Sequence, residues 1–190
     1  MKIQTLKQAN TNLINQALID SKITVEFALI KKELIAHFAV QSEQAPSVSP
    51  QLASDSSQWG LWDWDVVELF LATSDSTVYY EFQVSPLNQF FELEIFEPRK
   101  RYNKEFKTGF IHSASKTEKG WTAEMRIPLE KLNWDGRKES LRGNAFAILH
   151  QTHGPTHWSL NLPKQEKPDF HLPQYFQPFF SGAGGGGASD

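Results

Sequence analysis

Tryptophans, carboxylates and an amide lie close together in the stretch WGLWDWDVVELFLATSDSTVYYEFQVSP, which begins at Trp59. If the strand that contains Glu68 extends back to Trp62, both side chains fall on one face, and Gln83 falls on one face of the next strand. An indole ring stacks on the C–H face of a sugar, while carboxylates and amides hydrogen-bond its hydroxyls. These residues therefore suit carbohydrate recognition. The alternative is a solvated outer face, which is ordinary in antiparallel sheets.

The same alternation extends this polar face to other strands. Its further members are Tyr79, Glu81, Glu92, Glu94, Thr122, Glu124 and Arg126. If the strands adjoin, we expect carboxylates, amides and an arginine beside the indole rings. Glu92 and Glu94 are same-face neighbours at i and i+2, so they do not form the carboxyl pair of a glycosidase. Trp121 begins an inward series with Ala123 and Met125, and is predicted to lie in the core.

Two other clusters carry chemical groups. His150, His153 and His157 place three imidazoles within eight residues, which is conceivable for a metal site, but the intervening Gly-Pro pair breaks any helix that would align them. We expect them to line a loop. The run RKRYNKEFK, 99–107, could hold a phosphate or polyanion, but its shortness and the acidic chain favour a solvated hairpin loop.

Composition narrows the classes of function. Nineteen basic and 22 acidic side chains give a net charge of −3, so we expect neither a nucleic-acid nor a membrane partner. The chain has no cysteine, which excludes disulfides, thiolate metal sites and a cysteine nucleophile. It also lacks a glycine-rich phosphate loop, a serine nucleophile elbow and a metalloprotease motif. The sequence gives no positive evidence for catalysis, so we expect a protein that is not an enzyme.

Strands dominate the predicted secondary structure, because apolar residues recur at alternate positions and 13% of the 190 residues are aromatic. Seven strands are predicted, at 22–30, 33–41, 65–72, 77–84, 89–97, 120–128 and 144–151. Turn residues separate them, including a hairpin tip at KTEKGW. Helical spacing is limited to 10–19 and the short 128–134. The fold class is therefore all-β, an antiparallel β-sandwich of immunoglobulin or jelly-roll type with few short helices.

The length fits a single domain over 1–180, with a long Ser-, Gln- and Pro-rich loop at 41–58. The glycine-rich segment 181–190 is typical of a flexible tail or tag remnant. The first residues lack the apolar core of a signal peptide. We therefore expect a soluble protein, cytoplasmic as written, or periplasmic or extracellular if a leader has been removed. The sequence does not define an oligomeric state.

Four blocks in order give a more specific indication: WDWDVVELFL, VYYEFQVSP, GWTAEMRIPLEKL and DFHLPQYF. Together they resemble the family 9 carbohydrate-binding modules and the wider group of DOMON-like sandwiches, over residues 23–180. The resemblance implies a sandwich that holds the end of a sugar chain between two aromatic rings. By motif, Trp62 matches the first ring and Glu68 the sugar-contacting glutamate. Gln83 falls where characterised modules have an arginine, and Phe170, or alternatively Trp158, falls near the second ring.

The resemblance also implies two cofactor hypotheses. Family members often carry structural calcium, and the acidic loop ATSDS around Asp75 offers hard oxygen ligands. Some DOMON-like relatives hold haem through Met, His or Lys, and here Met125 is the single internal methionine, which alternation places in the core. Three functions stay open: a non-catalytic carbohydrate-binding module, a structural or interaction sandwich that has lost sugar binding, and a haem-binding domain.

Overall fold

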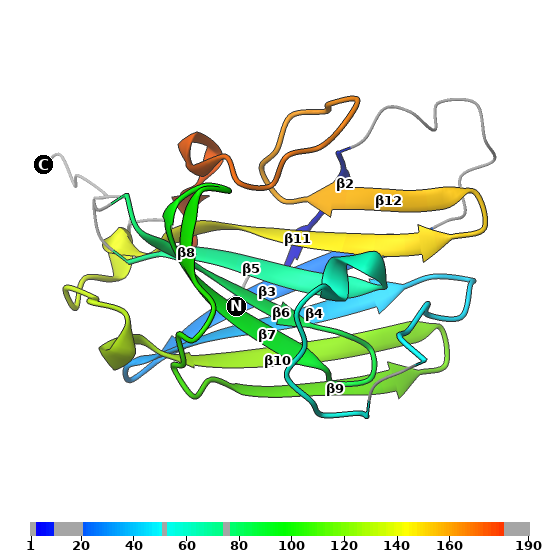
Figure 1. The fold of residues 1–190 in the computed structure, drawn as a ribbon, viewed down its shortest axis with the longest axis horizontal. Helices are drawn as coiled ribbons and strands as arrows, with labels where there is room; N and C mark the ends of the chain where they lie inside the picture. The colour runs from blue at the N-terminus through cyan, green and yellow to red at the C-terminus, as the bar shows by residue number, and fades with distance from the viewer. Residues whose placement is uncertain (1–2, 10–20, 51–52, 74–76, 181–190) are drawn as a thin grey trace, which may run out of the picture.

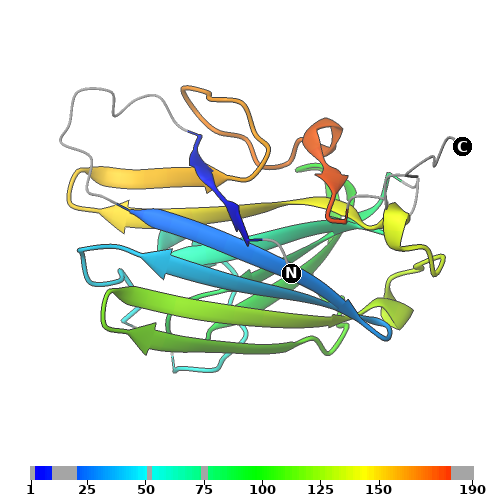
Figure 2. The ribbon, with the colours of Figure 1, turned by 180° about the vertical axis from the view of Figure 1, so that it is seen from behind.

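Two antiparallel β-sheets pack face to face in the computed structural model, which describes residues 3–9, 21–50, 53–73 and 77–180. In Figure 1 the second sheet is nearer the reader. Figure 2 shows the molecule from the opposite side, with the first sheet nearer the reader. No helix in these ranges is long and apolar enough to cross a membrane. The predicted all-β sandwich is confirmed.

The first sheet has the strand order β1-β3-β4-β10-β9. Its strands are β1 (Ile3–Thr5), β3 (Lys22–Ile30), β4 (Glu33–Gln41), β10 (Gly120–Pro128) and β9 (Ile111–Thr117). Its long strands alternate between buried and less buried residues, except at the end of β3, because one face packs on the second sheet and the other faces outward.

The second sheet has the order β2-β12-β11-β5-β6-β7-β8, and a short β13 also pairs with β11. Its strands are β2 (Lys7–Gln8), β12 (Gly154–Ser159), β11 (Arg142–Gln151), β5 (Val66–Ala72), β6 (Tyr79–Val84), β7 (Phe90–Glu97), β8 (Arg101–Asn103) and β13 (Gln177–Pro178). All six residues of β6 are buried, so the centre of this sheet is covered on both faces.

Each face of the second sheet carries its own apolar cluster. The inner cluster lies between the sheets and includes Val67, Phe82 and Trp121. The outer cluster includes Phe70, Phe146 and Phe170, and the segment after β12 supplies part of it. Figure 1 shows this C-terminal segment, in orange and red, folded back beside β11 and β12. The alternative of a solvated outer face is therefore wrong for this sheet.

The seven predicted strands all form, with ends shifted by at most two residues. Trp121 and Met125 lie in the inner core, as alternation predicts. The short helical spacing at 128–134 becomes a single 3-10 turn, Leu129–Lys131, and further 3-10 turns occur at Lys138–Ser140 and Pro173–Tyr175. The sequence analysis missed β9 and β12 and the shortest strands. The helical spacing at 10–19, the segment 181–190 and Asp75 lie outside the described residues.

Several assignments of direction or extent need correction. The strand does not extend back to Trp62, because a 3-10 turn, Leu61–Asp63, precedes it and β5 begins at Val66. Glu92 lies opposite Phe82 and so faces the inner core, where its carboxylate accepts hydrogen bonds from the Thr108 amide and hydroxyl. Glu94 lies opposite Tyr80 on the same side.

The polar series Thr122, Glu124 and Arg126 belongs to β10 in the first sheet, so it does not join the face that carries Glu68. There Arg126 pairs with Glu33 at 2.9 Å across the sheet surface.

Gly143, where β11 pairs with both β5 and β13, gives a test of the packing. A Cβ atom at Gly143 would lie 1.9 Å from the Phe70 carbonyl oxygen and 2.4 Å from the Phe179 ring, so Gly143→Ala forces backbone to move. We expect a loss of about 1–3 kcal/mol in the free energy of unfolding, measured with denaturant. Ser115→Ala, on exposed β9, is the control, and equal stability of the two variants would contradict the packing described here.

Candidate functional site

A cavity of about 440 Å³ opens on the outer face of the second sheet, above β5, β6 and β7. Its lining is Trp59, Trp62, Glu68, Phe70, Glu81, Gln83, Leu93, Ile95, Arg99, Tyr102, Ile148, His157, Pro168, Phe170 and His171. The strands provide a rigid floor, while the 3-10 turn, β8 and the segment after β12 provide the sides. This volume lies within the range of sites for small molecules.

Three buried polar side chains form the floor. Glu68 on β5 lies directly opposite Gln83 on β6, and Glu81 is two residues before Gln83 on the same face. Gln83 Nε2 donates to Glu68 Oε1 at 3.1 Å and to Glu81 Oε1 at 2.5 Å. Their exposed fractions are 3%, 1% and 4% for Glu68, Gln83 and Glu81. We call these three residues the acidic floor.

Burial controls the protonation of the acidic floor. Desolvation raises the pKa of Glu81 to about 7, although the hydrogen bond from Gln83 favours its charged form. Desolvation also raises the pKa of Glu68 well above its usual range, and the nearby charge of Glu81 raises it further. The two carboxyls therefore disfavour simultaneous ionisation, and near neutral pH the floor retains a proton.

A neutral histidine stands beside the floor. His171 Nδ1 is 2.9 Å from the Tyr79 hydroxyl, and its Nε2 is 4.0 Å from Glu81 Oε2. Burial lowers the pKa of His171 to about 4, and the Arg99 charge contributes in the same direction. Desolvation raises the pKa of the Tyr79 phenol, so this hydroxyl keeps its proton and can donate to Nδ1. In that tautomer His171 carries its hydrogen on Nε2, the ring nitrogen that is nearer Glu81.

Aromatic rings form the opposite side of the cavity. Trp59 meets Trp62 edge to face at 4.7 Å between centroids and stacks on Tyr102 at 6.0 Å. Trp62 is half-buried, whereas Trp59 is 42% exposed. Lys104 Nζ lies 3.5 Å from the centroid of the Trp59 ring, a cation–π contact. Phe170 is only 7% exposed and stacks on Phe146 at 4.1 Å, so one face of its ring is already covered.

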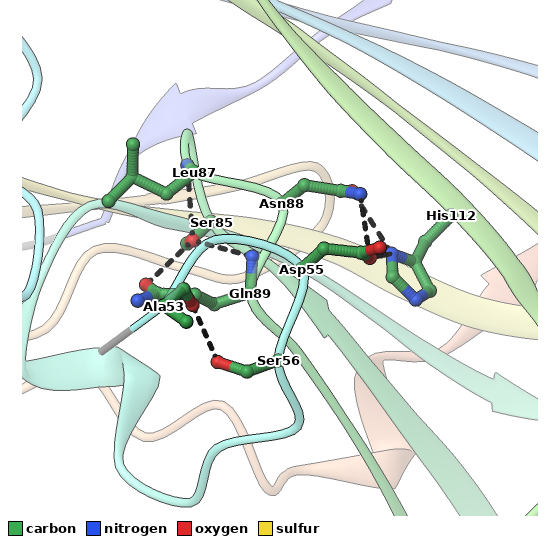
Figure 3. A network of polar contacts seen from close by, with 8 residues as sticks. All are labelled: Ala53, Asp55, Ser56, Ser85, Leu87, Asn88, Gln89 and His112. Atoms are coloured by element: carbon green, nitrogen blue, oxygen red, sulfur yellow. Dashed lines mark hydrogen bonds and ion pairs between the residues drawn. The ribbon is translucent and has the colours of Figure 1, made fainter.

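The loop 41–58 helps to position the tryptophans. Figure 3 shows its end attached to the β6–β7 turn: Asn88 Nδ2 donates to Asp55 Oδ1 at 3.1 Å, and Asn88 Oδ1 lies 3.0 Å from His112 Nδ1. Ser57 then pairs with Phe90 in an isolated parallel bridge. Gly60, at φ 91°, provides the left-handed residue that leads into the 3-10 turn bearing Trp62.

The structure brings four of the five sequence-predicted residues to this cavity: Trp62, Glu68, Gln83 and Phe170. It places the fifth, Trp158, elsewhere. Trp158 pairs with Ala147 and packs against the inner core, with Nε1 donating to Thr156 Oγ1 at 3.0 Å. Neighbouring residues of a strand face opposite sides, so His157 lines the cavity instead.

Sequence reasoning missed the contribution of the basic run 99–107. It is not simply a solvated loop, because residues 101–103 form β8 on the edge of the second sheet, and Arg99 and Tyr102 line the cavity. Arg99 also pairs with Asp169 at 2.7 Å, which ties the β7–β8 turn to the C-terminal segment. Aromatic residues within a basic run were the available signal.

The histidine cluster does not converge on one point. His157 faces the cavity, while His150 Nε2 lies 3.0 Å from the Trp62 carbonyl oxygen and so supports the 3-10 turn. Within the described ranges, no group of three or more His, Asp or Glu side chains is arranged to hold a metal ion. Met125 is fully buried between the sheets, so it does not present its sulfur to a cavity.

Comparisons with known proteins give distant relatives. No family model matches the chain. It is 29% identical over 127 residues to the UPF0462 protein C4orf33 homolog of Danio rerio, covering 63% of this chain and 61% of that protein. The human UPF0462 protein C4orf33 is 27% identical, covering 63% and 60%. The chain thus spans about three fifths of these relatives. An "Extracellular protein" of Arthroderma benhamiae is 27% identical over 173 residues, covering 81% of this chain and 76% of that protein.

Solved structures match over most of the chain. A Bacteroides uniformis protein, described provisionally as carbohydrate-binding, has a TM-score of 0.73 and 16% identity, covering 93% of this chain and 84% of its own. A family 9 carbohydrate-binding module of Caldicellulosiruptor kristjanssonii, in complex with cellotriose, has a TM-score of 0.54 and 13% identity, covering 93% and 80%. At these identities the likeness shows the fold alone: the chain has the β-sandwich fold of carbohydrate-binding modules.

The raised pKa of Glu81 predicts a pH-dependent stability difference. The folded protein binds the Glu81 proton more tightly than the unfolded chain does, so this group costs increasing stability as pH rises from about 4.5 to about 7. Glu81→Gln removes the cost. We expect the variant to match the unaltered protein near pH 4 and to exceed it by up to about 3 kcal/mol at pH 8, in denaturant unfolding.

The comparison with the variant is necessary because other groups titrate in the same range. The lowered pKa of His171 has the opposite sign, since its stability cost is lost as pH rises through about 4 to 6.5. Asp65, raised to about 6 by burial, has the same sign as Glu81. A stability difference between Glu81→Gln and the unaltered protein that stays constant from pH 5 to pH 8 would contradict the buried acidic floor.

Proposed function

We propose that this protein is a non-catalytic carbohydrate-binding module-like domain that recognises a sugar, or the end of a polysaccharide, in the cavity above the acidic floor. One observation carries the proposal: Trp62 and the floor residues Glu68, Gln83 and Glu81 share one cavity. An aromatic platform beside fixed hydrogen-bonding groups is the arrangement that a pyranose requires, with its C–H face on the ring and its hydroxyls on the polar groups.

The fold supports the proposal. The neighbouring structures include a family 9 module in complex with cellotriose and the same kind of module in complex with glucose. The motif match of Trp62 and Glu68 to that family agrees with their common position in the cavity. The carboxyls of Glu68 and Glu81 both accept from the Gln83 amide, which fixes them as hydrogen-bonding groups.

The binding mode differs from a clamp of two tryptophans. Phe170 stacks on Phe146 and leaves little ring surface, and Gln83 provides an amide without a charge. We therefore infer that stacking depends mainly on Trp62, with Trp59 and Tyr102 at the rim. These features also favour the second candidate, a sandwich that keeps the fold for interaction or structure and has lost sugar binding.

Trp62→Ala separates the two candidates. A glycan array on the unaltered protein first identifies a bound sugar, and calorimetry then measures its affinity for each variant. We expect Trp62→Ala to weaken binding at least about tenfold, because the platform is lost. The melting temperature should change little, because Trp62 is half-buried in a short surface turn, Leu61–Asp63.

Trp64→Ala is the matched control, since Trp64 is also half-buried and lies two residues further on but does not line the cavity. Undiminished binding by Trp62→Ala contradicts the proposed site. The absence of any bound sugar on the array supports the interaction domain instead.

A further inference from the structure

Within the described part of the chain, the acidic floor contains two unpaired hydrogen-bond acceptors, both buried beside the cavity. Both hydrogens of the Gln83 amide nitrogen are directed at carboxylate oxygens, one on Glu68 and one on Glu81. The remaining atoms, Gln83 Oε1 and Glu81 Oε2, are buried and have no hydrogen-bond partner among the described residues. Both atoms belong to residues that line the cavity. When Glu81 is ionised, a ligand satisfies both atoms only by donating hydrogen bonds.

No cation of the described chain neutralises this floor. Arg99 lines the cavity, but its guanidinium is engaged by Asp169 at 2.7 Å. His171 is near Glu81 Oε2 but is uncharged at neutral pH. Lys104 lies over Trp59 and is not among the lining residues. The floor therefore attracts positive charge and repels negative charge within a poorly solvated space.

We propose that this cavity, taken as the sugar site of the proposed function, selects sugars that carry a primary ammonium group, such as hexosamines, over neutral and acidic sugars. The ammonium donates to Glu81 Oε2 and Gln83 Oε1, and the sugar ring stacks on Trp62. A primary ammonium is required because it has several N–H donors. A quaternary ammonium has none, and leaves both acceptors unpaired.

Acidic sugars are excluded by the same groups. A uronic acid would bring a carboxylate against Glu68 and Glu81, which already disfavour each other's charge. An N-acetylated hexosamine keeps one N–H but loses the positive charge, so it should bind like a neutral sugar.

Proton release gives an independent signature. A bound ammonium favours the ionised form of the carboxyls, whose pKa values burial raises. Binding of a cationic sugar near neutral pH therefore expels a proton to the buffer, and binding of a neutral sugar does not. Calorimetry in two buffers with different ionisation enthalpies measures this release directly.

The experiment is a calorimetric titration of the full chain with glucosamine, glucose, N-acetylglucosamine and glucuronic acid at neutral pH. We expect glucosamine to bind about tenfold more tightly than glucose, because a charge-assisted hydrogen bond is roughly twice as strong as a neutral one. N-acetylglucosamine should match glucose, and glucuronic acid should bind most weakly. Only glucosamine should show a buffer-dependent enthalpy.

Glu81→Gln tests the assignment to the acidic floor. It keeps the shape and the acceptor for Gln83 but removes the charge, so the preference for glucosamine over glucose should fall to about even. Glu124→Gln is the matched control, because Glu124 lies on β10 of the first sheet, away from the cavity, and should keep the preference.

The outcomes separate this inference from the function on which it rests. Equal affinities for glucosamine and glucose overturn the charge preference and leave the sugar site intact. Binding of tetramethylammonium chloride in the cavity as tight as that of glucosamine also overturns it, because that ion donates no hydrogen bond. Failure of all four sugars to bind overturns this inference, whereas the proposed function fails only if the glycan array also finds no bound sugar.

Discussion

The double hydrogen bond of the Gln83 amide is the constraint on which the site depends. Covering both faces of the second sheet buries Glu68, Gln83 and Glu81, and buried carboxyls are costly unless they are hydrogen-bonded or protonated. The amide nitrogen donates to one oxygen of each carboxyl, so it links the polar side chains of β5 and β6. Among the described residues, this arrangement leaves two buried acceptors unpaired beside the cavity. Their high energetic cost in an otherwise apolar layer is the physical argument for a functional role.

Alternation in the sequence identifies the faces of the central strands correctly, but it cannot say which face is covered. Val67 and Glu68 do point to opposite sides, yet both are buried. The direction of Glu92 depends on pairing, because residues directly opposite each other share a face, and Glu92 lies opposite Phe82. The alternation within one strand does not reveal which residues of the next strand lie opposite. The prediction therefore grouped Glu92 with the wrong face of the sheet.

The site was predictable where a motif and a strand coincide, as for Glu68 and Gln83. Trp62 was placed in the cavity region although its local structure was wrong, since a glycine at positive φ and a 3-10 turn carry it there. Trp59, Tyr102 and His171 come from three segments that meet only in the folded chain. His157 and Trp158 are neighbours on β12, so their side chains point to opposite faces. An error of one position along the strand therefore assigned the core residue Trp158 to the site in place of His157.

A crystal structure of the protein with a bound glucosamine-terminated oligosaccharide tests the central claim most directly. The account predicts density for a sugar ring against Trp62, with donors within hydrogen-bonding distance of Gln83 Oε1 and Glu81 Oε2, and with the Gln83 amide still bonded to both carboxyls. A sugar bound outside this cavity, or a ring in the cavity that leaves both acceptors unpaired, would contradict it.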